Sequence, residues 1–138
     1  MKTSINSSII LTCLLFTLSS CSDNNIYFDI NNQSVRSCNK KVISKLHIIS
    51  KNNNDFYFFS KKPEAEGTNN FSLFTLNHSY FLENMNSQIC IDSFKLMPET
   101  EYEITNSTFG DADRTQILIK TDKEGKVIYS NVTSCKLN

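Results

Sequence analysis

The sequence contains little glycine, little proline and no excess of charge of either sign. Its 138 residues include only 3 Gly and 2 Pro, which excludes collagen-like chains and Gly/Pro-rich disordered chains. The 14 basic and 14 acidic residues give a formal net charge of zero, so the chain lacks the basic excess of proteins that bind nucleic acid. Apolar residues make up 39% of the chain, which is enough for a packed core. The length favours a single domain.

The sequence also lacks a motif for catalysis or metal binding. It has no Gly-rich phosphate loop, no HExxH and no Ser-His-Asp order. His47 has the solvent-facing parity of a predicted strand, beside Lys45, and His78 lies in a polar segment. Both patterns favour surface positions over activation of a nucleophilic cysteine. Asp111 and Asp113 indicate a turn, because the further oxygen ligands that calcium requires are missing. The cysteines and histidines are too scattered for a zinc site, so we expect no metal, no cofactor and no enzymatic activity.

The amino terminus is basic at its start and then apolar. Lys2 precedes an apolar run from Ile9 to Leu18. A basic start followed by about ten apolar residues is typical of a secretory signal, and such a run is too short to span a bilayer. The run ends in Leu18-Ser19-Ser20-Cys21, which resembles the lipobox of bacterial lipoproteins. That resemblance implies that Cys21 becomes the first residue of the mature chain and carries diacylglycerol and an acyl chain such as palmitate.

The predicted anchor divides the chain and implies a location. We expect residues 1–20 to be the lipoprotein signal peptide, residues 21–25 a lipidated tether and residues 26–138 the folded domain. Lipid chains hold a domain at a membrane without a spanning helix, since each buried methylene contributes about 0.8 kcal/mol. Ser22 stands where an Asp often retains lipoproteins in the inner membrane. The resemblance therefore implies the bacterial cell envelope, at the outer membrane and facing the periplasm.

Beyond the tether, apolar residues recur with a period of two, which predicts β-strands. The expected strands are residues 26–30, 42–48, 56–59, 71–76, 89–96, 102–104, 116–120 and 126–129. Seven or eight short strands at spacings of roughly ten residues are typical of a β-sandwich. The sequence therefore predicts an all-β fold, an antiparallel β-sandwich of about seven strands like those of immunoglobulin and fibronectin type III domains.

One string supports the fibronectin-like prediction. Leu96, Pro98, Tyr102 and Ile104 have the spacing of the tyrosine corner of fibronectin type III domains, which they resemble. In such a corner the tyrosine ring lies in the core and its hydroxyl bonds to upstream backbone where the chain crosses between sheets. Leu96, Pro98 and Tyr102 are therefore predicted as structural residues, a feature that implies a fold and not a function.

Three cysteines remain once the signal and the acylated residue are set aside. Cys38, Cys90 and Cys135 would lie in an oxidising compartment, where a disulfide is the expected state. Three thiols allow three pairings and leave one thiol over. We favour Cys38–Cys90, which closes a loop of about fifty residues and stabilises by about 4 kcal/mol in the chain-entropy model. Cys135 is the alternative partner.

The string Asp55-Phe56-Tyr57-Phe58-Phe59 is the most informative candidate for a binding surface. On a sandwich strand only one face meets the core, so either Phe56 and Phe58 or Tyr57 and Phe59 point outward. Exposed aromatic side chains on one strand are typical of an interaction site. The alternative is that a loop, for example Glu64–Asn70, covers them. We predict the four aromatic residues as the candidate interface.

These features resemble one group of small lipoproteins, the type VI secretion immunity periplasmic lipoproteins of enteric bacteria. The resemblance lies in the lipobox, in the fibronectin-like body and in Gln88-Ile89-Cys90-Ile91 followed by Phe94 and the Pro-x-x-x-Tyr corner. Cys135 and an Asn-rich amino-terminal half depart from it. The resemblance implies a non-catalytic immunity protein that binds and neutralises a toxin delivered by neighbouring cells. The alternative is an envelope binding or assembly module for a glycan or another envelope protein.

Overall fold

The computed structural model describes residues 24–85, 87–107 and 115–135. This part of the chain forms ten strands and one short 3-10 helix: β1 (Ile26–Asp29), β2 (Ser34–Ser37), β3 (Lys45–Ser50), β4 (Phe56–Lys61), β5 (Asn70–Ser72), β6 (Tyr80–Asn84), β7 (Ser87–Ile89), η1 (Ile91–Ser93), β8 (Glu101–Ser107), β9 (Thr115–Thr121) and β10 (Val127–Ser130). The predicted all-β class is confirmed. No helix in these ranges has the length and apolar character to cross a membrane.

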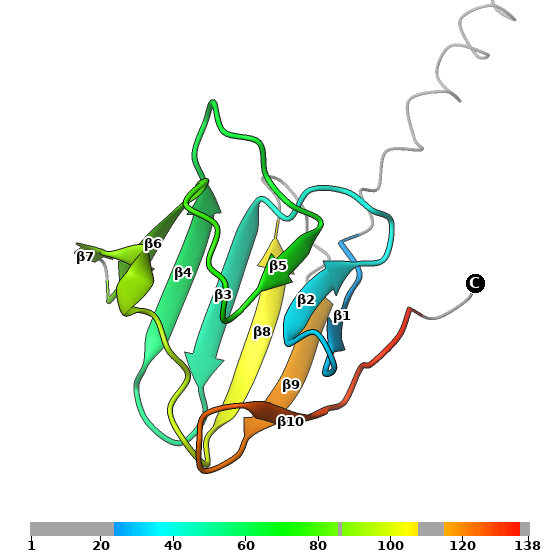
Figure 1. Cartoon of the computed structure of the whole chain (residues 1–138), viewed down its shortest axis with the longest axis vertical. Helices are drawn as coiled ribbons and strands as arrows, with labels where there is room; N and C mark the ends of the chain where they lie inside the picture. Colours follow the sequence, from blue (N-terminus) through cyan, green and yellow to red (C-terminus); the bar gives the residue numbers. More distant parts are fainter. Residues whose placement is uncertain (1–23, 86, 108–114, 136–138) are drawn as a thin grey trace, which may run out of the picture.

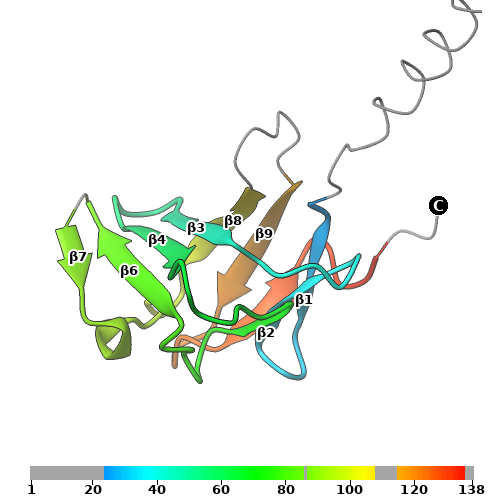
Figure 2. The ribbon, with the colours of Figure 1, turned by 90° about the horizontal axis from the view of Figure 1, so that it is seen from above.

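The strands form two antiparallel sheets. The small sheet has the order β1-β2-β5, and the large sheet has the order β10-β9-β8-β3-β4-β6-β7. The small sheet covers one face of the large sheet (Figure 1). Figure 2 shows the same molecule from above, with β6 and β7 at one side and β1 at the other, next to β9. The domain is therefore an antiparallel β-sandwich, as predicted.

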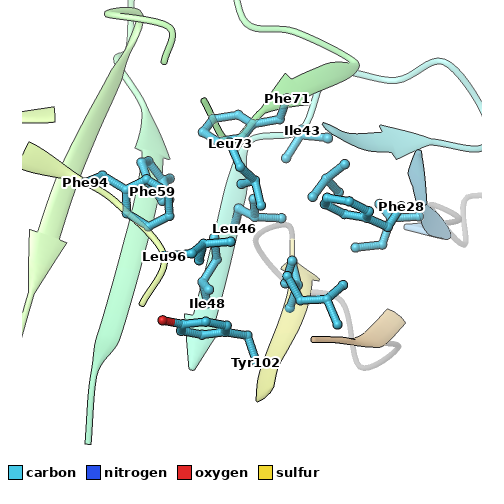
Figure 3. Packing of buried hydrophobic residues seen from close by; sticks show 14 of the residues in the cluster. Phe28, Ile43, Leu46, Ile48, Phe59, Phe71, Leu73, Phe94, Leu96 and Tyr102 are labelled. Carbon is cyan, nitrogen blue, oxygen red and sulfur yellow. The ribbon is translucent and has the colours of Figure 1, made fainter. Parts of the chain in front are cut away.

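Alternation along the central strands defines the two faces of the large sheet. Leu46 and Ile48 of β3 are buried while their neighbours are only partly covered, and β8 repeats this pattern. Close packing between the sheets is visible in Figure 3. The largest fully buried side chains are Tyr80, Tyr102, Phe28, Phe59, Phe71, Ile26, Ile43, Leu46, Ile48, Leu82, Ile104 and Ile117. Each such apolar side chain stabilises the fold by about 1.5–3 kcal/mol relative to an exposed position.

The chain returns from β7 at the edge of the large sheet to β8 in the same sheet, so it does not cross between sheets as predicted for a tyrosine corner. The contacts of the tyrosine itself agree with the prediction. The Tyr102 ring is fully buried, and its hydroxyl accepts a hydrogen bond of 2.7 Å from the Met97 N–H. Leu96 is buried on the same side of β3 (Figure 3), whereas Pro98 is exposed in the turn. Burial raises the pKa of the Tyr102 hydroxyl. The neutral hydroxyl therefore holds the backbone of the turn against the start of β8.

The disulfide joins Cys38 to Cys135, with Cα atoms 5.5 Å apart, so the favoured pairing Cys38–Cys90 is wrong. Cys90 is a free, exposed thiol that follows β7, at the far edge of the large sheet. The carboxyl-terminal segment instead runs beside β1, where the Val132 carbonyl accepts a hydrogen bond of 2.9 Å from the Phe28 N–H. This course brings Cys135 to Cys38, the alternative that the sequence left open.

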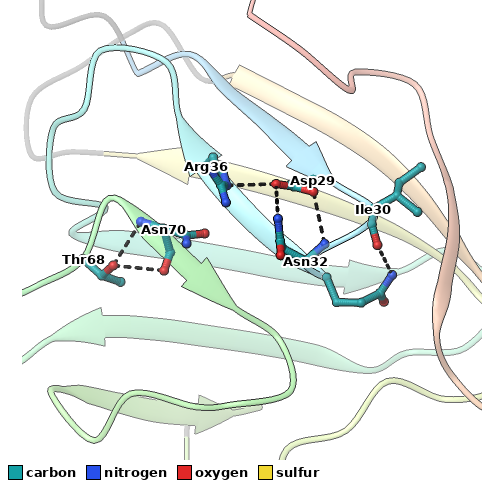
Figure 4. A network of polar contacts seen from close by, with 7 residues as sticks. Asp29, Ile30, Asn32, Arg36, Thr68 and Asn70 are labelled. Carbon is teal, nitrogen blue, oxygen red and sulfur yellow. Dashed lines mark hydrogen bonds and ion pairs between the residues drawn. The ribbon is translucent and has the colours of Figure 1, made fainter.

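A polar network fixes the turn between β1 and β2. The Asp29 carboxylate accepts hydrogen bonds from the Asn32 backbone N–H at 3.1 Å and from Asn32 Nδ2 at 2.8 Å, and it pairs with Arg36 Nε at 3.1 Å (Figure 4). The Asn32 side chain, followed by its backbone N–H, holds the pKa of Asp29 below its usual value. The turn therefore favours the ionised carboxylate.

A buried glutamine joins the small sheet to β10. The Gln33 side chain donates hydrogen bonds to the Ile30 carbonyl at 2.6 Å and to the Val127 carbonyl at 2.8 Å. Its oxygen accepts a hydrogen bond of 2.8 Å from the Val127 N–H. One amide thus satisfies backbone groups of the β1–β2 turn and of β10, which would otherwise be costly to bury.

Candidate functional site

The candidate site is the face of the large sheet that points away from the core. Side chains between the buried positions of β3, β4, β8 and β9 project from this face. Cross-strand pairing places them in two rows, which together we call the outer face: Phe56, Ile49, Glu103 and Leu118, and next to them Phe58, His47, Thr105 and Gln116. Residues directly opposite one another on one face are close enough to interact, so each row is a continuous strip of surface across four strands.

The four aromatic residues of the predicted interface divide between the two faces. Phe59 is fully buried, and Tyr57 packs edge-on against Phe94 with ring centroids 5.0 Å apart. Phe56 and Phe58 belong to the outer face, where both are only partly covered. The alternation within β4 therefore leaves half of the predicted set available to a partner.

The loop that the sequence offered as a cover lies at the end of the sheet. The Thr68 carbonyl accepts a hydrogen bond of 2.8 Å from the Ile43 N–H, and the Thr68 N–H donates one of 3.0 Å to the Tyr80 hydroxyl. The same hydroxyl donates a hydrogen bond of 2.6 Å to the Ile43 carbonyl. These contacts hold the loop over the buried Tyr80 on the core side, away from Phe56 and Phe58.

His47 is at the centre of the aromatic part of the outer face. Its ring centroid lies 4.6 Å from that of Phe58 and 5.9 Å from that of Phe56. Its Nε2 atom lies 3.4 Å from the hydroxyl of Ser107. The solvent-facing position expected for His47 from its strand parity agrees with this placement. Its contact with the two phenylalanines depends on the register between β3 and β4, which the sequence alone does not reveal.

Two hollows flank this aromatic cluster. An open hollow of about 490 Å³ is lined by Phe58, Pro63, Lys45, Lys61, Ser44 and Ser60. A smaller one of about 130 Å³ is lined by His47, Ile49, Glu103, Thr105 and Ser107. The lining of the larger hollow combines the aromatic ring of Phe58 with the basic side chain of Lys45, so it suits a protruding side chain with an apolar body and a negative tip.

Two ion pairs lie in and beside the row of the outer face that contains Glu103. Lys51 pairs with Glu103, and this hydrogen bond holds the pKa of the Glu103 carboxyl below its usual value. Glu101 pairs with Lys120 at 2.5 Å, which raises the pKa of the Lys120 ammonium. The aromatic cluster thus has a polar border, an arrangement typical of protein interfaces.

The free thiol is part of a small exposed cluster. The Cys90 thiol lies 3.9 Å from Asp92 Oδ2, and His78 Nε2 lies 3.5 Å from Asp92 Oδ1. The carboxylate is therefore the shared contact of the thiol and the imidazole, whereas an activated cysteine needs its base directly beside the sulfur. Within the described ranges, no three His, Cys, Asp or Glu side chains are grouped to hold a metal ion.

The remaining predicted sites fall outside the described residues. These are the lipidation site Cys21 and the two aspartates of the predicted turn, Asp111 and Asp113. The chain matches no protein-family model, no curated protein and no solved structure.

Proposed function

We propose that this chain is a lipid-anchored binding protein of the bacterial envelope that neutralises a secreted toxin through its outer face. The observation that carries the proposal is the cluster of Phe56, Phe58 and His47 on an open sheet face with a charged border. Aromatic residues dominate binding energy in protein interfaces, and a surrounding polar rim excludes water from them. Inhibition by steric cover needs no catalytic group, which fits the absence of a catalytic motif in the sequence.

The larger hollow supports one anchoring contact with such a partner. Phe58 and Lys45, which belong to the same face of the sheet, both line it. The Lys61 ammonium is bound to the carbonyls of Lys62 and Ala65, each at 2.9 Å, on the core side, so the positive charge offered to a partner is that of Lys45. A toxin loop that offers an acidic side chain next to an apolar one would match both features.

The second candidate is an envelope module that binds a glycan. Its specific support is the same hollow, because the Phe58 ring and the hydroxyls of Ser44 and Ser60 that line it also suit a sugar ring. The two candidates differ in how much of the outer face they use. A protein partner covers both Phe56 and Phe58, whereas a single sugar occupies only the hollow beside Phe58.

The test is binding of the acylated mature chain to the secreted protein encoded beside its gene, and in parallel to a glycan array. Phe56→Ser is expected to weaken toxin binding by about 30-fold or more, as for an aromatic hot spot worth about 2 kcal/mol. Ile128→Ser is the matched control, because Ile128 is exposed on β10 outside the outer face. Equal affinity of both variants, or binding only to a glycan with no effect of Phe56→Ser, would refute the toxin proposal.

A further inference from the structure

The fold begins closer to the predicted anchor than the sequence suggests. Asn24 is buried, and its carbonyl accepts a hydrogen bond of 3.1 Å from Asn106 Nδ2. The Asn25 carbonyl accepts a hydrogen bond of 2.9 Å from the Cys38 N–H, and its side-chain oxygen accepts one of 2.9 Å from the Thr115 hydroxyl. The last two residues of the predicted tether therefore belong to the sandwich.

This attachment leaves almost no free chain between a lipid on Cys21 and the domain. Three residues span at most about 10 Å when fully extended. The Debye length at physiological ionic strength is about 8 Å. An acylated Cys21 would therefore hold this end of the sandwich within electrostatic reach of the lipid headgroups.

The segment at this end is basic and has an exposed apolar residue. Lys40 and Lys41 are exposed, and Val42 beside them is 44% exposed. The segment follows Cys38, which is bonded to Asn25 and bridged to Cys135. Lysines next to an apolar side chain are a typical combination for contact with an anionic bilayer surface.

The segment is fixed in place by neighbouring loops. The Lys40 carbonyl accepts a hydrogen bond of 3.2 Å from Asn69 Nδ2. The Ile43 N–H is bound to the Thr68 carbonyl, and a side-chain carbon added to Gly67 would meet Val42 Cγ1 at 2.2 Å. The two lysines thus project from an ordered part of the surface.

Charge is distributed unevenly between the two ends of the large sheet. The same end also carries three further lysines, Lys45, Lys61 and Lys62, against the acidic side chains Glu64 and Glu66. The opposite end has the acidic residues Asp55, Glu99, Glu101, Asp122 and Glu124 interspersed with Lys51, Lys120, Lys123 and Lys126. Among the residues that the structure describes at these two ends, positive charge therefore predominates at the end where the lipid would be attached; Asp111, Asp113 and Arg114, between β8 and β9, lie outside the described residues.

We propose that the segment Lys40–Val42 rests on the anionic phospholipid surface of the leaflet that holds the acyl chains. The two ammonium groups would face lipid phosphates and Val42 would enter the headgroup region. The outer face then stands upright from the bilayer, open to a partner. This inference depends on the acylation of Cys21 that the proposed function includes.

The test uses the acylated mature chain in vesicles of phosphatidylcholine, with and without phosphatidylglycerol. Each lysine is reacted with a soluble amine reagent, and the rates are read by peptide mass spectrometry. On anionic vesicles Lys40 and Lys41 are expected to react about fivefold more slowly, the factor that corresponds to about 1 kcal/mol per Lys at an anionic surface. Lys123 and Lys126 serve as internal controls, because the seven residues of β9 separate them from Thr115 by about 20 Å.

Salt and one pair of variants sharpen the result. Protection is expected to disappear in 1 M salt, where the Debye length is about 3 Å. Lys40→Gln is expected to reduce the protection of Lys41, and the matched Lys123→Gln to leave it unchanged. Equal protection at both ends, or none at Lys40 and Lys41 of an acylated chain, overturns the orientation alone. If mass spectrometry finds no added acyl mass on the peptide that contains Cys21, both the lipid anchor and the orientation are refuted.

Discussion

Truncation of two adjacent residues of β4 should have different effects: one should lower the stability of the fold, and the other should weaken binding. Phe59 is fully buried, with ring centroids 5.0 Å from those of Phe71 and Phe94. Truncation of a buried Phe to Ala costs about 3–5 kcal/mol, because the cavity collapses only partly. Phe58 is only partly covered on the outer face, so Phe58→Ala should cost about 1 kcal/mol or less. The pair therefore separates stability from binding within one strand.

The assay is urea unfolding of the mature chain with its disulfide intact. With an m-value of about 2 kcal/mol/M, Phe59→Ala should lower the midpoint by about 2 M and Phe58→Ala by about 0.5 M or less. Phe58→Ala should instead weaken binding to the partner. Similar losses of stability for both variants would show that the two faces of β4 have been assigned wrongly.

A milder pair keeps the comparison measurable, because domains of this size are stable by only about 5–15 kcal/mol and Phe59→Ala removes much of that. Ile48 is fully buried on β3, whereas Ile49 next to it lies on the outer face. Ile48→Val should cost about 1 kcal/mol. Ile49→Val should leave the unfolding midpoint unchanged within error. A larger effect at Ile49 than at Ile48 would contradict the assignment of the two faces of the sheet.

Three further predictions concern the disulfide, the buried amide and acid stability. Cys135→Ser should destabilise by about 4–5 kcal/mol, since the bridge spans 97 residues; Cys90→Ser should have no effect, and non-reducing peptide mapping should find Cys90 unpaired. Gln33→Leu should cost about 2–3 kcal/mol in urea unfolding, because both backbone groups of Val127 lose their partner; a neutral result would contradict the bridging role. The pKa of Glu103 is lower in the folded state than in the unfolded state. Its contribution to the free energy of unfolding is therefore complete above the unfolded-state pKa of about 4.3, and it is lost as the pH falls through the folded-state pKa. Unfolding midpoints between pH 7 and pH 3 should fall less steeply in Glu103→Gln than in the parent chain.

Most strands were predictable because a period of two is a local property of the sequence. β3, β4, β8, β9 and β10 all fall on segments expected from alternation. β2 and β6 (Tyr80–Asn84) were both missed. β2 contains one apolar residue, Val35, and forms a strand only through pairing with β1 and β5 on either side. β6 pairs in the same way with β4 and β7. The strand expected over residues 89–96 was wrong: β7 ends at Ile89 and the chain turns through η1. The apolar side chains of Ile91, Phe94 and Leu96 are nevertheless buried, although the segment that carries them is not a strand.

By itself the sequence determined the all-β class, since apolar alternation requires one buried and one open face on each strand. It could not decide which face of β4 is open, because aromatic residues occupy both parities from Phe56 to Phe59. Nor could it choose the partner of Cys38. Both depend on contacts between residues far apart in the chain. The small sheet covers Phe59, and the carboxyl-terminal segment follows β1, so that the Cα atoms of Cys135 and Cys38 lie 5.5 Å apart. Only the tertiary structure decides such contacts, because they are made by neighbours in space.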